Sequence, residues 1–415
     1  MPPVDILVAG TSCKDMSRAN SGAAAKSPSL VLTQATSRGG SADTFQGFLQ
    51  YVESHRPFFI FFENVDAMMD ESSKSSGAGG AGSNMDVFLA ELSSRGYEAQ
   101  AVIVDANEFG LPCRRRRCHV FLIRAIANPL VDFADRSVDA VFTTFRGLLS
   151  ACICQAPCAS KVRLDSKDLA VKAELEARQA ARASARGESV PNSCAWVDAH
   201  MQFAEHNRLR WGQPAPEDLQ RNAWFGLLTH REQDALVLNR AALPSACYMF
   251  RDVSQSVTRV STLSKKDDRP DRHVGPTMMP RQCLWMEDER KEEGCRIMLG
   301  REALLFQGFP AIQFLESIGP EENDWRELTE RAEEEVSGKS SKKKSARRAD
   351  FRNWPSESLM SDLAGNAMAL PVMLAMVQCA FASISWKEDV QQTPAATQQA
   401  GSLINSGLGL GFRVV

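Results

Sequence analysis

Four short segments of the sequence carry groups that can do chemistry, and three of them stand at or near predicted strand ends. They supply the thiol of Cys13, the carboxylate of Glu63, the guanidinium cluster Arg114–Arg117 and the amide of Asn366. A thiolate nucleophile needs nearby positive charge to lower its pKa, and the arginines can provide it. A neighbouring carboxylic acid can protonate or hydrogen-bond an electrophilic ring nitrogen. Taken singly, each group also fits an ordinary structural role: a buried thiol, a helix-turn carboxylate, a solvated basic face or a turn residue.

The elements that must position these groups alternate between strands and helices. Apolar runs at 4–9 and 57–62 predict two buried strands, and apolar residues at helical spacing predict a helix over 42–54. Further elements are predicted as a helix at 88–92 and strands at 97–104 and 118–123. Strands joined through helices predict an α/β fold with a parallel sheet, and such sheets hold ligands at the carboxyl ends of their strands.

Composition divides the chain into six predicted segments. They are a first domain at 1–126, an inserted region at 127–295, a return to the first domain at 296–326, a charged linker at 327–354, a C-terminal helix of the first domain at 355–388 and a disordered tail at 389–415. The Ala-, Glu- and Arg-rich stretch at 169–186 predicts an exposed helix. The Ser- and Gly-rich stretch at 72–83 predicts a flexible insertion.

The order of the reactive segments resembles that of the cytosine-5 DNA methyltransferases. Cys13 and Ser17 match the family's nucleophile loop, in which a serine follows the cysteine by four residues, and Glu63-Asn64-Val65 matches letter for letter. The other matches are Gly110–Arg117 to Gly-x-Pro-Gln-x-Arg-x-Arg, Arg301–Pro310 to Arg-Glu-x-x-x-x-Gln-Gly-Phe-Pro and Gly365–Val372 to a Gly-Asn-Ala helix start. Five ordered matches over roughly residues 4–125 and 250–380 predict membership of this family.

The resemblance implies a Rossmann-like S-adenosylmethionine-dependent methyltransferase fold and a methyl transfer to carbon 5 of a cytosine flipped out of double-stranded DNA. Cys13 would attack carbon 6 of the base. Glu63 would contact the ring N3 and the exocyclic amine. Arg115 and Arg117 would orient the base and balance the charge of the thiolate. These four residues are the predicted catalytic set.

The resemblance also implies binding roles outside the catalytic set. Ser17 would contact DNA phosphate near the flipped base, and Asn366 and Ala367 would line the S-adenosylmethionine site. Residues 127–295 occupy the slot of the family's target-recognition region, where groove contacts decide sequence preference. No metal site is implied.

The sequence departs from the family pattern around its first predicted strand. Ser12 and Lys14 flank the cysteine where the family has Pro and Gln, and Cys113 replaces a Gln. The family's Phe-x-Gly-x-Gly segment and two further strands, which build most of the cofactor pocket, are not found before residue 4. Gly407–Phe412 could supply that segment only by circular permutation. We therefore expect an open, apolar sheet edge.

Two functions follow from this departure. In the first, the chain is a catalytic methyltransferase, and its cofactor pocket is completed either by a further part of the same protein or by a partner subunit. In the second, it is an inactive or truncated relative that binds DNA or a protein partner. Among enzymes, a tRNA cytosine-5 methyltransferase shares the same segments and is the alternative to a DNA enzyme.

Composition excludes several other classes. Hydrophobic residues make up 44% of the chain and charged residues 24%, which excludes a collagen, a coiled coil or a wholly disordered chain. The net charge of −3 requires any basic surface to be local. Eleven cysteines without a signal peptide predict free thiols, and the spacing of Cys152, Cys154 and Cys158 does not favour zinc.

Location and membrane contact are predicted from two other stretches. The apolar stretch at 372–386 is too short to span a bilayer, so no membrane partner is predicted. The basic run Lys342–Arg348 fits a nuclear-import signal and a solvated linker about equally. The nucleus is the predicted location, with the cytoplasm as the alternative.

Overall fold

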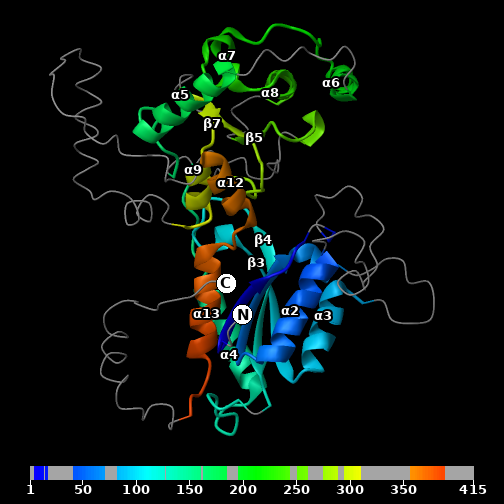
Figure 1. Cartoon of the computed structure of the whole chain (residues 1–415), viewed down its shortest axis with the longest axis vertical. Coiled ribbons are helices and arrows are strands. Elements are labelled where there is room, and N and C mark those ends of the chain that lie inside the picture. Colours follow the sequence, from blue (N-terminus) through cyan, green and yellow to red (C-terminus); the bar gives the residue numbers. More distant parts are fainter. Residues whose placement is uncertain are drawn as a thin grey trace, which may run out of the picture. The chain divides into compact units, whose positions relative to one another are not determined.

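The computed structural model describes the residues that carry most of the predicted elements. They are residues 4–13, 15–16, 41–70, 82–126, 128–159, 162–184, 195–243, 250–259, 274–287, 294–309 and 356–387. Ser17, nearly all of the predicted insertion at 72–83, the charged linker and the tail lie outside the described residues. Contacts group the chain into two compact units (Figure 1). The first is Met1–Phe109, Arg116–Cys154 and Pro371–Val415, and the second is Gly110–Arg115 and Gln155–Leu370. The predicted segment boundaries follow composition rather than contacts and stay predictions.

The first unit contains a four-stranded sheet in the order β1-β2-β4-β3. Its strands are β1 Ile6–Gly10, β2 Phe59–Val65, β3 Tyr97–Asp105 and β4 Arg116–Arg124. Strands β1 and β2 are parallel, whereas β4 is antiparallel to both β2 and β3. The prediction of a parallel sheet is therefore wrong for β4. The physical reason is the connection from β3 to β4, which contains only a short 3-10 turn, Ala106–Glu108, and no crossover helix.

Helices cover both faces of this sheet (Figure 1). On one face lie α2 Ser41–His55 and α3 Asn84–Ser93, and on the other lie α4 Val138–Ala151 and α13 Leu370–Ala382. Phe62 of β2 meets the rings of Phe48 and Phe88 on the first face. Phe61, its neighbour in the strand, meets Phe381 on the second face. Successive strand residues point to opposite faces, so the continuous apolar run Phe59–Phe62 contributes to both cores.

Strand β1 stands at one edge of the described sheet. It pairs with β2 from Ile6↔Phe59 to Gly10↔Glu63, and no other described strand pairs with it. Leu7 and Ala9 pack toward the core formed with α2 and α3. The expected edge position of this strand is thus found within the described part of the sheet.

The predicted C-terminal helix is two helices in the structure. Glu357–Ala382 is long and apolar enough to cross a membrane when judged only by length and composition. It breaks between α12 Glu357–Asn366 and α13, and half of its most apolar stretch is buried inside the protein. The side chains that α13 buries are Val372, Met373, Ala375, Met376, Val377, Cys379 and Ala380. Burial of this kind is typical of a core helix.

The second unit combines short helices with a small antiparallel sheet. Its helices are α5 Leu169–Ser184, α6 Ala195–His206, α7 Glu217–Arg221, α8 His230–Ala242, α9 Gly300–Phe306 and α12. Its strands, in sheet order, are β5 Phe250–Asp252, β6 Leu284–Met286 and β7 Arg296–Ile297. Trp285 is fully buried at the centre of this unit's core. The predicted exposed helix at 169–186 is confirmed as α5, which buries Val171 and exposes most of its length.

Buried ion pairs hold this small sheet in place. Arg251 Nε lies 2.9 Å from Glu287 Oε1, and Arg240 Nε reaches the same oxygen at 3.1 Å. Arg296 binds both carboxylate oxygens of Glu302 at 2.7 Å. Because a buried charge without a partner is costly, each of these arginines is paired with a carboxylate, through a two-pronged contact or at a shared oxygen. These charges serve the structure of the unit.

Candidate active site

Glu63 and Arg117 meet at the carboxyl end of β2. In the β2–β4 ladder Val65 pairs with Arg117 and Glu63 pairs with His119, so the two charged side chains lie on the same face of the sheet. Arg117 Nε lies 3.3 Å from Glu63 Oε1, and the side chains are 17% and 10% exposed. The antiparallel direction of β4 makes this possible, because it brings the first residues of β4 to the last residues of β2.

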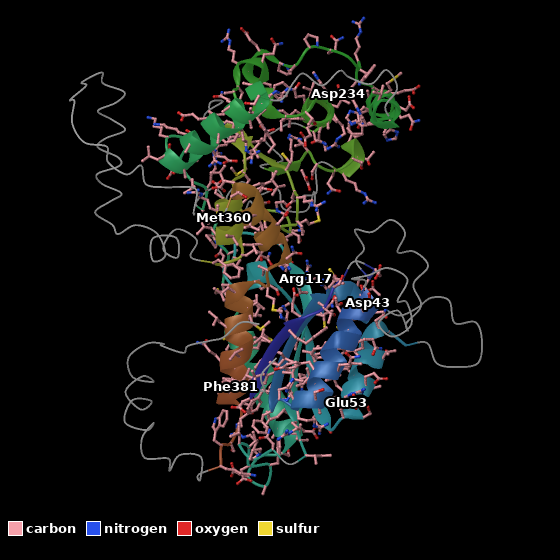
Figure 2. The ribbon with its side chains drawn as sticks, viewed as in Figure 1. Asp43, Glu53, Arg117, Asp234, Met360 and Phe381 are labelled. Carbon is pink, nitrogen blue, oxygen red and sulfur yellow. The ribbon has the colours of Figure 1, made fainter. Side chains whose placement is uncertain are left out.

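Arg117 is held in this orientation by its own strand. Its Nη1 donates a hydrogen bond to the carbonyl oxygen of Arg116 at 2.8 Å. Figure 2 shows Arg117 at the end of the sheet where α2 begins near Asp43, away from Glu53 and Phe381. The guanidinium of Arg117 therefore lies at the same edge of the sheet as the predicted nucleophile loop.

The loop that carries Cys13 is fastened to β2 by Asn64. The side-chain nitrogen of Asn64 donates to the carbonyl oxygen of Thr11 at 3.2 Å and to its hydroxyl at 3.0 Å. The Asn64 side-chain oxygen accepts from the backbone N–H of Val65 at 2.8 Å. Asn64 is 2% exposed. It therefore fixes the backbone two residues before Cys13, a role that sequence reasoning did not assign to it.

The other side of the loop is fastened to the first turn of α2. The Ser12 N–H donates to Thr44 Oγ1 at 2.9 Å. The Asp15 N–H donates to the Ser41 hydroxyl at 3.2 Å, and the Ser41 N–H donates to the Asp15 carboxylate at 2.8 Å. A carboxylate is favourable at a helix amino terminus. Sequence reasoning missed these residues, although a Ser and a Thr at a predicted helix start are a recognisable capping signal.

Two cysteines of the first unit, Cys13 and Cys118, have different environments. Cys13 is partly exposed at the end of its loop, and Cys118 is fully buried in β4. Burial raises the pKa of the Cys118 thiol to about 12, and the nearby carboxylates of Glu63 and Asp66 act in the same direction. A thiol held in its protonated form is a poor nucleophile. Exposure and loop position thus favour Cys13 as the reactive thiol.

Arg115 belongs to the second unit, where it has a different environment from Arg117. Its side chain is 5% exposed, and Nη1 lies 3.5 Å from the carbonyl oxygen of Met278 and 3.4 Å from that of Gly365. These are long contacts at the limit of hydrogen bonding. The structure therefore brings Glu63 and Arg117 together beside the Cys13 loop, and places Arg115 against the backbone of the predicted cofactor segment.

Cys113, which replaces the family's Gln, is a buried structural residue. Its thiol donates to the carbonyl oxygen of Phe306 at 3.0 Å. Backbone hydrogen bonds join the same segment to Gly275, from Gly275 N–H to Pro112 O at 2.7 Å and from Arg114 N–H to Gly275 O at 2.9 Å. These contacts fix the backbone on both sides of Cys113 within the second unit.

The predicted helix start at Gly365–Val372 is confirmed by α13, which begins at Leu370. The position of Asn366 differs from the prediction, because Asn366 is the last residue of the preceding helix α12. Asn366 Nδ2 donates to the Asp362 carbonyl oxygen at 2.9 Å, and the Ala367 N–H donates to Leu363 O at 2.7 Å. A Cβ at Gly365 would lie 2.1 Å from the backbone nitrogen of Pro280. The glycine is therefore required for close backbone packing.

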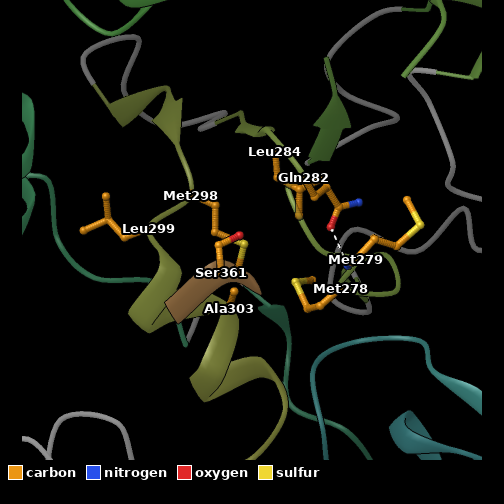
Figure 3. A pocket seen from close by; sticks show the side chains of 8 residues that line it. All are labelled: Met278, Met279, Gln282, Leu284, Met298, Leu299, Ala303 and Ser361. Atoms are coloured by element: carbon orange, nitrogen blue, oxygen red, sulfur yellow. Dashed lines mark hydrogen bonds between the residues drawn. The ribbon is translucent and has the colours of Figure 1, made fainter. Parts of the chain in front are cut away.

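A small cavity in the second unit contains none of the predicted site residues (Figure 3). Its volume is about 10 Å³, which corresponds to roughly one water molecule. It is lined by Met278, Met279, Gln282, Leu284, Met298, Leu299, Ala303 and Ser361. This cavity is too small for a nucleoside cofactor, which needs about 300 Å³ or more.

A partly exposed thiol, an ion-paired carboxylate and a guanidinium at the carboxyl edge of an α/β sheet are groups that covalent modification of a pyrimidine would require. The family model of the C-5 cytosine-specific DNA methylases matches residues 1–318. The chain belongs to this family. The resemblance predicted from the sequence motifs is confirmed, as is the α/β methyltransferase fold class that it implied.

Two curated relatives are each 26% identical to the chain over the residues that align. The DNA (cytosine-5-)-methyltransferase DMT5 of Cryptococcus neoformans is 26% identical over 340 residues, which is 75% of this chain and 12% of DMT5. The type II methyltransferase M.MspI of Moraxella sp is 26% identical over 133 residues, which is 32% of this chain and 27% of that protein. The chain thus spans a small part of both curated relatives.

Solved structures that match the chain include two methyltransferases. The S. pombe Dnmt2 methyltransferase is 13% identical, with a TM-score of 0.36 and coverage of 91% of this chain and 77% of that chain. The Entamoeba histolytica methyltransferase EhMeth is 9% identical, with a TM-score of 0.35 and the same coverage.

Proposed function

We propose that this chain carries the catalytic residues of a cytosine-5 methyltransferase that acts on double-stranded DNA. The observation that carries the proposal is the Glu63–Arg117 pair at the carboxyl end of β2, beside a Cys13 loop that Asn64 fastens to the same strand. The family description and the name of the relative DMT5 support DNA over tRNA as substrate.

The chain's own residues would divide the work as follows. The Cys13 thiolate bonds to carbon 6 of an extruded cytosine, which makes carbon 5 electron-rich. The carboxyl group of Glu63 hydrogen-bonds N3 and the exocyclic amine and so stabilises the charge that develops on the ring. Arg117 holds Glu63 and contributes positive charge at the same edge of the sheet. Ser17 keeps its predicted role as a phosphate contact, and it lies outside the described residues.

Arg115 would act on the reaction through the backbone. Its contacts to the carbonyl oxygens of Met278 and Gly365 suit a residue that holds the Gly365–Ala367 break in place. In this proposal Arg117 orients the base, and Arg115 positions the segment that contains Asn366.

S-adenosylmethionine, when bound, supplies the methyl group. The described residues fit one edge of its site: Asn366 is an exposed amide at a helix break whose backbone the Gly365 packing keeps fixed. The rest of a nucleoside-sized pocket would come from outside the described residues. The unpaired edge of β1 in the described sheet suits a further strand there, from the same protein or from a partner subunit.

The function is tested by covalent capture on duplex DNA that contains modified cytosines. A 5-azacytosine base has a more electrophilic carbon 6, so the Cys13 adduct should form without any cofactor. On 5-fluorocytosine a stable adduct requires methyl transfer as well, because fluorine cannot leave carbon 5 as a proton does. We expect the first adduct with this chain, and the second once the cofactor pocket is complete.

Variants and a second nucleic acid complete the experiment. Cys13→Ser should abolish both adducts, whereas the exposed-thiol control Cys154→Ser should retain them. An adduct that persists in Cys13→Ser would remove Cys13 from the role. Capture of tRNA in place of duplex DNA would reassign the substrate. No adduct on either nucleic acid would favour the binding-module alternative.

Cofactor binding is measured separately by calorimetric titration of S-adenosylmethionine into the chain. A dissociation constant weaker than about 100 μM is expected if other sequence completes the pocket. Micromolar binding would show that this chain completes it alone. Because the proposed substrate is chromosomal DNA, the proposed location in a nucleated cell is the nucleus. The position of a fluorescent fusion protein in the cell tests this location.

A further inference from the structure

Two thiols of the first unit lie in contact although 227 positions separate them in sequence. Cys152 Sγ lies 3.6 Å from Cys379 Sγ. Cys152 caps the carboxyl end of α4, where its N–H donates to the carbonyl oxygens of Leu148 and Leu149. Cys379 lies in the last turns of α13. The methyltransferase site described above uses neither residue.

The two thiols differ in access. Cys152 is exposed, and Cys379 is 5% exposed. Burial raises the pKa of Cys379 to about 12, and its contact with Cys152 acts in the same direction. An oxidant from solvent therefore reaches Cys152 first, with a second thiol already beside it. An exposed thiol with an adjacent resolving cysteine is the arrangement found in reversible redox sites.

The position of the pair in the fold gives a bond between them a large effect. The chain leaves the first unit at Cys154 and returns to it at Pro371, and the whole of Gln155–Leu370 lies between. Cys152 stands just before the exit, and Cys379 stands shortly after the return. A bond between them would close one long covalent loop around that excursion and tie the end of α4 to α13.

We propose that Cys152 and Cys379 form a disulfide when the protein meets a peroxide. The sulfur of Cys152 attacks a peroxide oxygen, the O–O bond breaks, and Cys152 becomes a sulfenic acid with release of water. The sulfur of Cys379 then bonds to Cys152 Sγ, and the S–O bond breaks. The departing hydroxide takes up the Cys379 proton and leaves as a second water. In total, two thiols lose two electrons and hydrogen peroxide gains them.

The geometry needs only a local adjustment for this step. A disulfide requires an S–S distance of about 2.05 Å, so the sulfurs must approach by rotation of the two side chains. Cys154 is the competing partner, because it is also exposed and lies two residues from Cys152. Its backbone, however, is fixed by a hydrogen bond from its N–H to Glu108 O and by a bridge to Phe109. The pair with Cys379 is already in contact.

The test is peptide mapping of the full chain after treatment with hydrogen peroxide. Free thiols are alkylated, the chain is digested without reductant, and cross-linked peptides are identified by mass. We expect a peptide pair that joins Cys152 to Cys379 and is lighter by two hydrogen atoms than the sum of the reduced peptides. Cys154→Ser should retain this pair, and Cys152→Ser, a change at an exposed position, should lack it.

Thermal unfolding provides a second measurement. Closing so long a loop should raise Tm of the wild-type chain by about 5 °C or more, and dithiothreitol should reverse the rise. Oxidised Cys152→Ser should show no rise. A Cys152–Cys154 linkage, over-oxidation of Cys152 without any linkage, or an unchanged Tm in the linked protein would overturn the proposal.

Discussion

Arg117 Nε lies 3.3 Å from Glu63 Oε1, and the pair is largely buried at the carboxyl end of β2. The residues meet because β4 lies between β2 and β3 and runs antiparallel to both. The first residues of β4 therefore lie at the edge of the sheet that carries the Cys13 loop. The same ladder sets Glu63 opposite His119. The ion pair thus joins two motifs that are far apart in sequence, at the edge of the sheet to which the proposed function assigns base binding.

Replacing Arg117 should damage both stability and reaction. Arg117→Gln leaves the Glu63 carboxylate largely buried without this partner, so the free energy of unfolding should fall by about 1–3 kcal/mol. The rate of adduct formation should fall about 100-fold or more. Urea unfolding and capture kinetics on 5-azacytosine DNA measure the two effects.

The matched control is the neighbouring arginine. Arg116 is 63% exposed and lies 3.5 Å from Asp66. Arg116→Gln should change the free energy of unfolding by less than about 1 kcal/mol. Equal losses in the two variants would contradict the special role of the Glu63–Arg117 pair.

Asn64 should be needed to hold the nucleophile loop. Asn64→Asp keeps the size of the side chain but replaces both donors to Thr11 with a carboxylate that faces its carbonyl oxygen. We expect a loss of about 1–3 kcal/mol in the free energy of unfolding and a slower Cys13 adduct. Thr11→Val removes only one acceptor and should cost less. An Asn64→Asp variant with a wild-type adduct rate would show that the loop is fixed by its α2 contacts alone.

Two glycine-to-alanine changes should have opposite signs. At Gly365 the new methyl group would meet the Pro280 backbone at 2.1 Å, so Gly365→Ala should cost about 3 kcal/mol or more. At Gly147, inside α4, a Cβ meets nothing within 4 Å. Gly147→Ala should raise stability by about 0.5–1 kcal/mol because alanine favours the helix. Chemical unfolding of both variants tests the pair, and a harmless Gly365→Ala would refute the close packing.

Stability should fall in alkaline solution through the buried thiol of Cys118. Its pKa is raised from 9.0 to about 12 in the folded chain. Below pH 9 the thiol is protonated in both states, and its contribution to stability is fully present. From about pH 9 to 12 the unfolded chain loses this proton while the folded chain keeps it, so the contribution is lost as the pH rises.

Cys118→Ala isolates this contribution. Over pH 9.5–11, the free energy of unfolding should fall less steeply in Cys118→Ala than in the wild type, by up to about 1.4 kcal/mol per pH unit. Tyr97, whose pKa burial raises to about 12, adds the same slope to both proteins. Identical slopes in the two proteins would contradict the assigned pKa of Cys118. The comparison of slopes is independent of any fixed cost of the substitution.

Local patterns in the sequence were enough to predict most elements of the first unit, although helix α4 was not predicted. The apolar spacing at 42–54 predicts α2, and the run at 57–62 predicts most of β2, although the strand continues through Glu63, Asn64 and Val65. These predictions succeed because burial on one face of a helix or on both faces of a strand leaves a short-range signature. The motifs likewise predicted the family and, with it, the candidate residues.

The sequence by itself determined the family, most of the elements and the choice of Cys13, Glu63 and Arg117. Tertiary structure decided the direction of β4, the role of Asn64, the backbone contacts of Arg115 and the break at Asn366. It also decided the contact between Cys152 and Cys379. The physical reason is that periodicity and spacing report each residue's local environment. Strand direction, buried hydrogen bonds and thiol contacts instead depend on which distant segments pack together.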